Sequence, residues 1–453
     1  MKAKQPICSV LMLPWLAHGH VSSFLELAKR LAKKNFLIYL CSTPINLKSI
    51  ENKITQEFSH SIQLVELQLP ALPNLPPHYH TTNGLPPHLM LTLKEAFELS
   101  SENFSFILKE LQPNFVLFDF LQPWAATAAS SLKIPAAQFF TTGGVTSCFM
   151  IHFSRKGSLR FPFSSIYLHD FEEKKISQIL NSSSANGVRD ADKVFEGVQK
   201  STSIVLVKSF KEIEGKYLDH LSILAGKKAI PVGPLVRDFI DDGDDEGKAS
   251  IMEWLDKKEQ SSVVYVSFGS EYFSSMEELQ EIAYGLELSG VSFIWVVRFP
   301  TGENIKLEEA LPKGLPERVG ERGLVLEGWA PQTKILRHTS VGGFLSHCGW
   351  NSVMETMKIG VPIIAMPMHL DQPFNARLVQ DVGIALEVKR DINGRLERDE
   401  IAKVIREVMV EEKGEELRKK SKELSQTMLK KEDEEIDLVV EELLQLCKIG
   451  KTN

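Results

Sequence analysis

The chain has 453 residues, of which 43% are hydrophobic and 25% are charged. This composition is typical of a folded globular protein and excludes disorder over the whole length. The 52 basic and 59 acidic side chains give a net charge of −7. The basic surface that a nucleic-acid partner requires is therefore not expected.

Five cysteines lie far apart in the chain and form no CxxC pair. Their odd number and wide spacing predict neither a disulfide framework nor a zinc site, and they favour a reducing, cytoplasmic location. The apolar run 7–17 is similar to the apolar region of a signal peptide, but Pro14 interrupts it and no small-residue cleavage site follows. A buried strand is therefore favoured over a signal peptide. No apolar stretch reaches the ~18 residues that a membrane span requires.

Short apolar runs alternate with helical patterns in the first half of the chain, as they do in βαβ units with parallel strands. In chain order, the pattern predicts a strand at 7–13, a helix at 22–34, strands at 36–41 and 62–67, a Pro-rich stretch at 70–87, a helix at 89–111, strands at 115–118 and 136–140, and a helix at 145–153.

The acidic stretch RDFIDDGDDEGK has no periodicity and is interpreted as a solvated linker. Beyond it the pattern restarts, with strands predicted at 263–268, 293–297, 324–327, 342–346 and 362–366 and a charged helical region at 401–447. We therefore predict two doubly wound α/β domains at 1–236 and 249–430. The linker is at 237–248, and a helical tail at 431–453 is expected to pack back on the first domain.

Ligands of doubly wound sheets bind at the loops that follow the carboxyl ends of the strands. The first such loop carries His18 and His20, and a histidine at a helix N-terminus suits a neutral general base. Ordinary loop hydrogen bonds are the alternative, and a metal pair would need further ligands nearby. Asp119 ends the strand at 115–118, where it could orient such a histidine or cap the next helix.

Two loops of the second half could bind an anion. The turn Ser267-Phe268-Gly269-Ser270 offers backbone N–H groups and a hydroxyl, although a plain turn is the alternative. The second loop leads from the strand at 342–346 into a helix whose Ser352 and Glu355 have capping-box spacing. The N-terminus of that helix could hold an anion together with His347 and Asn351. Neither GxGxxG nor GxxxxGK[ST] occurs, so neither the dinucleotide fingerprint nor a P-loop is predicted.

The motifs WAPQ, GGFLSHCGWNSVMET and DQ, between Trp329 and Gln372, resemble in identity and spacing the signature box of plant UDP-sugar-dependent glycosyltransferases, family 1. The resemblance continues in the GH after the first strand, the Asp at a later strand end and the SFGS that opens the second half. It implies the GT-B fold, with two Rossmann-like domains facing a central cleft. The N-terminal domain would bind the acceptor and the C-terminal domain the UDP-sugar, with no metal and no cofactor.

The family pattern assigns donor contacts residue by residue. Trp329 would stack on the uracil beside Gln332, and Glu355 would bind the ribose hydroxyls. The resemblance implies that the diphosphate binds to Ser270, His347, Asn351 and Ser352. It implies that the sugar binds to Trp350, Asp371 and Gln372. Gln372 resembles the glucose-using members.

The same resemblance makes His20 the catalytic base and Asp119 its partner. His20 would take the proton of an acceptor hydroxyl that attacks C1 of the sugar, and Asp119 would orient the imidazole and balance its charge. His18 is the weaker candidate because the family's base follows the Gly. The expected reaction is inverting, so that an α-linked donor gives a β-glycoside.

Several motifs resemble the branch-forming enzymes that add a sugar to the sugar of a flavonoid, terpenoid or similar glycoside: LPWLAHGHVSSFLELAKRL, STPINL, TTNGLPPHL, EIEGKYLD, GSEYF and PFNARLV. Ser23 stands where many members that glycosylate an aglycone have Pro. The expected function is transfer of glucose from UDP-glucose to a sugar hydroxyl, by a 1→6 or 1→2 bond. The acceptor is expected at Trp15, Phe140, Thr141 and Thr142 and at the loop 70–87, although that loop could be plain surface.

The sequence leaves several alternatives. An enzyme acting directly on a phenolic or terpenoid aglycone is the main one, and the donor could also be UDP-xylose, UDP-rhamnose or UDP-glucuronate. A non-catalytic UDP-sugar-binding protein is disfavoured by the presence of His20 and Asp119. A nicotinamide-dependent dehydrogenase is disfavoured because its glycine fingerprint is missing. A monomer without membrane or nucleic-acid partners is expected, since no sustained heptads occur.

Overall fold

The protein is described by a computed structural model, which covers residues 6–183, 187–236, 246–300 and 305–452. Its contacts divide the chain into two compact units. Unit 1 comprises residues 1–161, 177–235 and 431–453, and unit 2 comprises 162–176 and 236–430. The segment 162–176 therefore groups with unit 2, although the sequence boundaries place it in the first domain. Most of the predicted linker, 237–245, lies outside the described residues.

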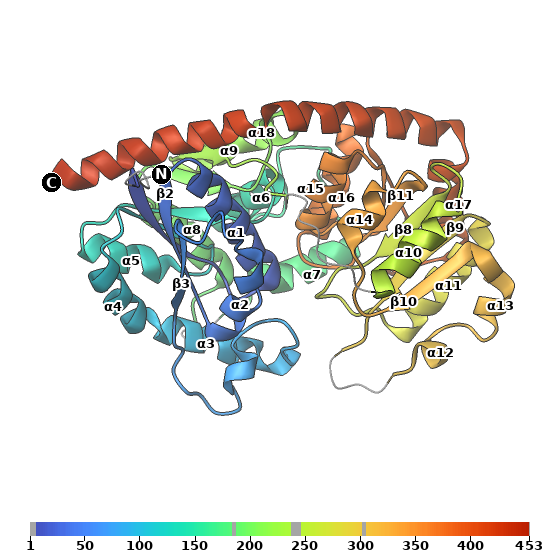
Figure 1. Ribbon diagram of the computed structural model, residues 1–453, viewed down its shortest axis with the longest axis horizontal. Helices are drawn as coiled ribbons and strands as arrows, with labels where there is room; N and C mark the ends of the chain where they lie inside the picture. Colours follow the sequence, from blue (N-terminus) through green and yellow to red (C-terminus); the bar gives the residue numbers. More distant parts are fainter. Residues whose placement is uncertain (1–5, 184–186, 237–245, 301–304, 453) are drawn as a thin grey trace. The chain divides into compact units, whose positions relative to one another are not determined.

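Unit 1 is built on a parallel sheet with the strand order β3-β2-β1-β4-β5-β6-β7. The order reverses between β1 and β4, which lie side by side and form the switch point of the sheet. The seven strands, blue to green in Figure 1, are β1 (Cys8–Leu13), β2 (Phe36–Ser42), β3 (Ile62–Glu66), β4 (Phe115–Phe118), β5 (Ala136–Phe140), β6 (Ile204–Val207) and β7 (Lys228–Pro231).

Both faces of this sheet are covered, because alternate residues of β1 belong to different core clusters. Val10 and Met12 pack in the cluster that includes side chains of α1 and of the end of α18. Leu11 and Leu13 pack on the other face, with side chains of α3, α4 and α5. A strand buried on both faces needs apolar residues throughout, and this explains the continuous apolar run at 7–13.

The helices of unit 1 are α1 (His18–Lys33), α2 (Pro44–Lys48), α3 (Met90–Leu99), α4 (Ser101–Leu111), α5 (Pro123–Ser131), α6 (Gly144–Lys156), α8 (Asp190–Lys200) and α9 (Lys211–Ala225). Short 3-10 turns are η1 (Glu51–Lys53), η2 (Pro77–Tyr79) and η3 (Pro87–Leu89). The single helix predicted at 89–111 is interrupted at Ser100, whose hydroxyl donates to the carbonyl of Phe97 (2.7 Å). Such back-bonding competes with the helical ladder.

Unit 2 contains a parallel sheet with the strand order β10-β9-β8-β11-β12-β13, so its switch point lies between β8 and β11. Alternate residues of β8 again belong to two core clusters, with Val264 and Val266 on one face and Val263 and Tyr265 on the other. The strands are β8 (Val263–Ser267), β9 (Ser292–Val297), β10 (Gly323–Glu327), β11 (Val341–Ser346), β12 (Ile363–Ala365) and β13 (Ala385–Glu387).

The helical elements of unit 2 are α10 (Glu246–Asp256), α11 (Met276–Ser289), α12 (Leu307–Ala310), α13 (Leu315–Val319), η4 (Gly320–Arg322), α14 (Gln332–Arg337), α15 (Trp350–Ile359), α16 (Gln372–Val382) and α17 (Arg398–Met409). α10 begins within the predicted linker. α7 (Asp170–Leu180) contributes its first residues to unit 2 and its last to unit 1.

The long C-terminal helix α18 (Glu412–Thr452), red in Figure 1, contributes residues to both units. Its part from Lys431 onward belongs to unit 1, where Glu435 accepts a hydrogen bond from the backbone N–H of Lys211 (2.7 Å). Near its end, Cys447 forms a disulfide with Cys8 of β1. The expectation that no disulfide would form was therefore wrong. The fold brings together two cysteines that lie at opposite ends of the sequence.

Membrane spans were sought among the described helices. None of those within 6–183, 187–236, 246–300 and 305–452 is both long enough and apolar enough to cross a bilayer. α18 has the length for a span, but it is rich in Lys and Glu.

Candidate active site

The loop after β1 and the loop after β4 meet at the switch point of unit 1. His20 lies in the first turn of α1, and its Nδ1 is 2.7 Å from Oδ2 of Asp119, which follows β4 directly. Adjacent parallel strands end at the same edge of the sheet, so two residues far apart in sequence come into contact. The resulting pair has the geometry of a base and the carboxylate that orients it.

Asp119 is fully buried and held by the backbone on both oxygens. Oδ2 accepts from the N–H of Trp15 (3.0 Å), and Oδ1 accepts from the N–H of Phe120 (2.8 Å). The N-cap of α5 is Gln122, so Asp119 is not the helix cap that was the alternative interpretation. Its carboxylate is therefore fixed in place to orient His20.

Two further residues contact His20. The hydroxyl of Thr141, in the loop after β5, lies 2.7 Å from Nδ1, and the ring of Phe120 lies 5.3 Å from the imidazole ring. Sequence reasoning missed Phe120, because nothing but its position after Asp119 marked it. Since Asp119 and Thr141 both approach Nδ1, Nε2 is the ring nitrogen that could accept a proton from a substrate.

The residues predicted to border the acceptor differ in burial. Phe140 has no accessible surface and Trp15 is 6% exposed, with its ring 5.6 Å from that of Phe97 in the core. Thr142 is partly buried, and its hydroxyl lies 3.0 Å from that of Ser147. The Phe140 side chain, which has no accessible surface, therefore does not line an open surface in this structure.

Ser23, which carried part of the subgroup resemblance, is buried one turn beyond His20 on α1. Its hydroxyl donates to the carbonyl of Gly19 (2.9 Å) and accepts from the ammonium of Lys208 (3.2 Å). A proline at this position would lose both contacts. Ser23 thus joins α1, the helix that carries His20, to the chain after β6.

In unit 2, the predicted anion site lies where β11 turns into α15. The helix begins at Trp350, and its N-cap is Gly349, which has no side chain to cap the first N–H groups. Ser352 and Glu355 therefore lie inside the helix, and the capping box suggested by their spacing does not form. A helix start of this kind presents its N–H groups to an anion.

His347 lies beside this helix start and is almost fully buried. A Cβ on Gly269 or on Gly349 would come within 2.6 Å or 2.4 Å of its Nε2, so only glycine allows the ring to sit there. Burial foremost, and next the charge of His369, lower the pKa of His347 to about 4. The imidazole is therefore neutral near pH 7 and would act on an anion as a hydrogen-bond donor.

Glu355 is held by residues of the neighbouring helix α14. Nε2 of Gln332 donates to Oε2 of Glu355 (2.6 Å) and lies 3.3 Å from the hydroxyl of Ser352, and the hydroxyl of Thr333 also bonds to the Glu355 carboxylate. Thr333 was not predicted from the sequence. Of the predicted donor residues, the structure thus brings three into one cluster.

Trp329 follows β10 and is 72% exposed, which is unusual for so large an aromatic side chain. The guanidinium of Arg298, after β9, lies 5.5 Å from the ring centre. An indole held in this way has an accessible face for stacking on a planar ligand.

The loop between β12 and α16 carries Asp371 and Gln372. Oε1 of Gln372 accepts from the N–H groups of Met368 (2.9 Å) and His369 (3.0 Å), so the amide closes its own loop. Oδ2 of Asp371 accepts from Nδ2 of Asn375 (2.8 Å), and the same nitrogen donates to the carbonyl of Cys348 (2.9 Å). Asn375, which sequence reasoning missed, thereby joins this loop to the start of α15.

The remaining predicted donor residues follow the same strand ends. Ser270 is partly buried after β8, Trp350 is buried in the first turn of α15, and Asn351 beside it is exposed. Within the described part of the chain, no cluster of three or more His, Cys, Asp or Glu side chains could hold a metal ion.

Two parallel sheets, each with polar residues at its switch point, define a two-domain α/β protein of the GT-B kind. The family model described as UDP-glucoronosyl and UDP-glucosyl transferase matches residues 241–427. The model described as Glycosyltransferase, N-terminal domain matches residues 7–237.

Known proteins agree with these family models. The chain is 53% identical to a mogroside IIIx synthase of Siraitia grosvenorii, over 97% of this chain and 93% of the relative. It is 50% identical to a beta-D-glucosyl crocetin beta-1,6-glucosyltransferase of Gardenia jasminoides, over 96% and 98%. Among solved structures it resembles Glycyrrhiza uralensis UGT73P12 complexed with glycyrrhetinic acid 3-O-monoglucuronide, with a TM-score of 0.81, 27% identity and coverage of 98% of each chain. The chain belongs to the plant family 1 UDP-dependent glycosyltransferases.

Proposed function

We propose that the protein transfers glucose from UDP-glucose to a sugar hydroxyl of a plant secondary-metabolite glycoside, with inversion at C1. The pairing of His20 with Asp119 carries this proposal. It supplies the base that a hydroxyl nucleophile requires, at the switch point where doubly wound sheets bind their ligands.

The proposed reaction forms one bond and breaks one. The acceptor oxygen attacks C1 of glucose from the face opposite UDP, and its proton passes to Nε2 of His20. The bond between C1 and the phosphate oxygen breaks, and UDP leaves with the electron pair. Asp119, fixed by the N–H groups of Trp15 and Phe120, stabilises the imidazolium that forms.

The donor is proposed to lie across the strand ends of unit 2. The exposed face of Trp329 would stack on uracil, and the carboxylate of Glu355, steadied by Gln332, would accept from the ribose hydroxyls. The diphosphate would bind the start of α15 with Ser270, His347, Asn351 and Ser352, and the sugar would contact Trp350, Asp371 and Gln372.

We propose that no metal assists departure of UDP. The N–H groups at the start of α15 and the neutral imidazole of His347 offer hydrogen bonds to the diphosphate instead. Transfer rates that do not change after EDTA treatment would support this. A loss of activity that Mg²⁺ restores would contradict it.

Transfer to a sugar hydroxyl is supported by the names of related enzymes, which specify acceptors that already carry a sugar. The name of the Gardenia enzyme specifies a glucosylated acceptor and a β-1,6 bond. A relative from Citrus maxima is named for transfer to the 2''-position of a flavanone 7-O-glucoside, so both the 1→6 and the 1→2 bond are kept in the proposal. The main alternative is direct glucosylation of a phenolic, flavonoid or terpenoid aglycone, and UDP-xylose or UDP-rhamnose are alternative donors. We further propose that the enzyme acts as a monomer in the cytoplasm, where the thiols of Cys8 and Cys447 would be reduced.

In the deciding experiment, the purified protein is incubated with UDP-glucose and with paired acceptors, each as an aglycone and as its monoglucoside. Mass analysis then identifies the products. A hexose added to the monoglucosides alone supports sugar-on-sugar transfer, and NMR of the product then gives the linkage and the anomer. A hexose added to the aglycones would overturn the acceptor assignment. The same assay with UDP-xylose and UDP-rhamnose tests the donor.

A further inference from the structure

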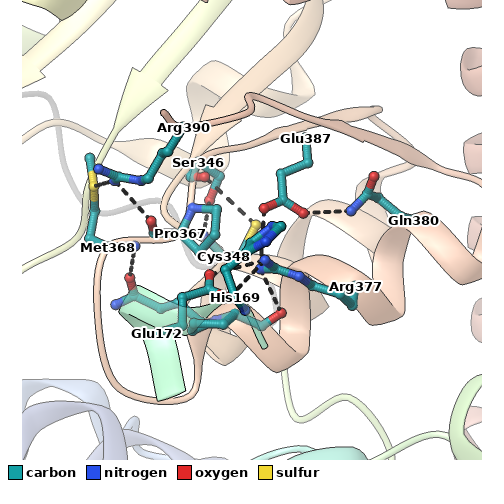
Figure 2. Close-up of polar contacts among 12 residues, drawn as sticks. His169, Glu172, Ser346, Cys348, Pro367, Met368, Arg377, Gln380, Glu387 and Arg390 are labelled. Atoms are coloured by element: carbon teal, nitrogen blue, oxygen red, sulfur yellow. Dashed lines mark hydrogen bonds and ion pairs between the residues drawn. The ribbon is translucent and has the colours of Figure 1, made fainter. Parts of the chain in front are cut away.

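Arg377 of α16 is a buried cation in unit 2, and its partner comes from a distant part of the sequence. Its Nη2 lies 3.0 Å and 2.9 Å from the two carboxylate oxygens of Glu172, which is 205 residues earlier in the chain. The Arg377 side chain has no exposed surface, and that of Glu172 is 6% exposed. Figure 2 shows the guanidinium between Glu172 and Glu387.

Glu172 is itself fixed. Its Oε2 accepts from the backbone N–H of His169 (2.8 Å), just before α7 begins. The adjacent Phe171 ring lies against Gly394, where a Cβ would come within 2.9 Å of the ring carbons. These contacts fix the segment 162–176 in unit 2 and hold the carboxylate of Glu172 in place beside Arg377.

Arg377 also contacts the first turn of α16. Its Nη1 donates to the carbonyl of Pro373 (3.3 Å) and lies 3.2 Å from Glu387. Pro373 directly follows Gln372. The guanidinium therefore ties the start of α16 to α7 and, through Glu387, to β13.

The loop before α16 is held from its other end by Arg390. The guanidinium Nη2 donates to the carbonyl of Pro367 (3.0 Å), and Nη1 donates to the carbonyl of Gly394 (3.0 Å), beside Phe171. A small cavity also borders this loop, lined by residues that include Phe171, Glu172, His369 and Arg390.

We propose that Glu172 is a positioning residue for the donor sugar, which acts through Arg377 to hold the loop that carries Asp371 and Gln372. This rests on the proposed function, in which that loop contacts the glucose of UDP-glucose. Uracil, ribose and diphosphate are assigned to α14, α15, the loops before them and Ser270 after β8, so the ion pair should affect sugar binding and leave nucleotide binding unchanged.

The test compares the affinities for UDP and for UDP-glucose by calorimetry, without an acceptor. Glu172→Ala should weaken UDP-glucose binding by about tenfold, which is the lower end of the loss seen when residues that orient metal ligands are removed. UDP binding should stay within about twofold of the wild type. Glu387 still pairs with Arg377 in this variant, so the buried charge is not left alone.

A milder variant and a matched control complete the experiment. Glu172→Gln keeps the shape and one acceptor oxygen, so its loss for UDP-glucose should be smaller than that of Glu172→Ala. The control, Glu281→Gln, removes a charge from the Glu281–Arg398 pair between α11 and α17 of the same unit and should leave both affinities unchanged.

Two results would overturn the proposal. One is an equal loss of UDP and UDP-glucose affinity in the Glu172 variants, which is what a general destabilisation of unit 2 would give. The other is wild-type affinity for UDP-glucose in Glu172→Ala. A wild-type protein that binds UDP-glucose but transfers no glucose would contradict the proposed function alone, because the binding comparison needs no acceptor.

Discussion

Nδ1 of His20 lies 2.7 Å from Oδ2 of Asp119, although the two residues are 99 positions apart. The hydrogen bonds that Trp15 and Phe120 donate to the carboxylate fix it in one orientation. The imidazole is therefore oriented before any substrate arrives, which is the arrangement that general-base catalysis requires.

His20→Ala should reduce kcat at least ~100-fold, since a positioned general base typically contributes that much. Asp119→Asn should also reduce kcat strongly, because the amide can neither balance the imidazolium charge nor fix the tautomer. UDP-glucose affinity should not change in either variant. Steady-state kinetics with a monoglucoside acceptor measure these effects.

The matched control for these variants is His18→Ala, in the same loop and two residues from the base. Its kcat should stay within about threefold of the wild type. If His18→Ala were the inactive variant and His20→Ala retained more than about a tenth of the activity, the assignment of the base would be reversed.

Thr333→Val should weaken UDP and UDP-glucose together, by about tenfold, because the hydroxyl that bonds to the Glu355 carboxylate is lost. This pattern is opposite to that expected for Glu172, where the sugar alone is affected. Thr333→Ser keeps the hydroxyl and should bind both ligands as the wild type does. Calorimetric titration of the wild type, Thr333→Val and Thr333→Ser with UDP and with UDP-glucose measures both affinities. Unchanged UDP affinity in Thr333→Val would show that the Glu355 carboxylate does not need the hydrogen bond from Thr333.

The buried carboxyl of Glu435 gives unit 1 a pH dependence of stability. Burial foremost, against the hydrogen bond from Lys211, raises the pKa of Glu435 to about 8. An acid with a pKa higher in the folded than in the unfolded state stabilises the fold at low pH, and this contribution is lost as the pH rises through the folded value. Glu435→Gln cannot ionise, so its melting temperature relative to the wild type should rise between about pH 6 and 8.5.

The same comparison has a built-in control, because the other shifted groups are present in both proteins. Burial also raises the pKa of Glu387, in unit 2, to about 7, and its effect cancels in the difference. A difference in melting temperature that stays constant over this pH range would show that Glu435 has an ordinary pKa in the folded protein.

Reduction of the disulfide between Cys8 and Cys447 should destabilise unit 1 by about 2–4 kcal/mol, the usual contribution of a cross-link that closes a long loop. The oxidised wild type should therefore melt at a higher temperature than the same protein in dithiothreitol. Cys447→Ser should melt at the lower temperature with or without the reductant. Equal melting of the oxidised and reduced wild type would show that the bond contributes nothing to stability.

Much of the fold follows from local patterns. The strands at 115–118 and 136–140 were predicted with their observed bounds, because an apolar run between turn residues defines a buried strand. The contact between His20 and Asp119 followed from the rule that neighbouring parallel strands end at one edge, together with the family resemblance.

Other features could not be predicted because they depend on where the fold brings distant residues. Cys8 and Cys447 meet only after α18 packs on unit 1, and no pattern links Glu172 to Arg377. The capping box at Ser352 and Glu355 failed for a local reason, since the spacing fits such a box but Gly349 starts the helix three residues earlier. Glu355 is thereby left to bond with Gln332 and Thr333.

The segment 162–176 belongs to unit 2, although the residues on either side of it belong to unit 1. This affects how chimeric enzymes should be built from two related parents. A junction in the acidic stretch 237–248 would take Glu172 from one parent and Arg377 from the other. If the second parent paired its arginine with a different residue of 162–176, the hybrid would lose this contact behind the loop that ends at Asp371, and Arg377 would pair with Glu387 alone. Hybrids that carry 162–176 together with 236–430 from one parent would keep the pair and the contacts that hold the start of α16.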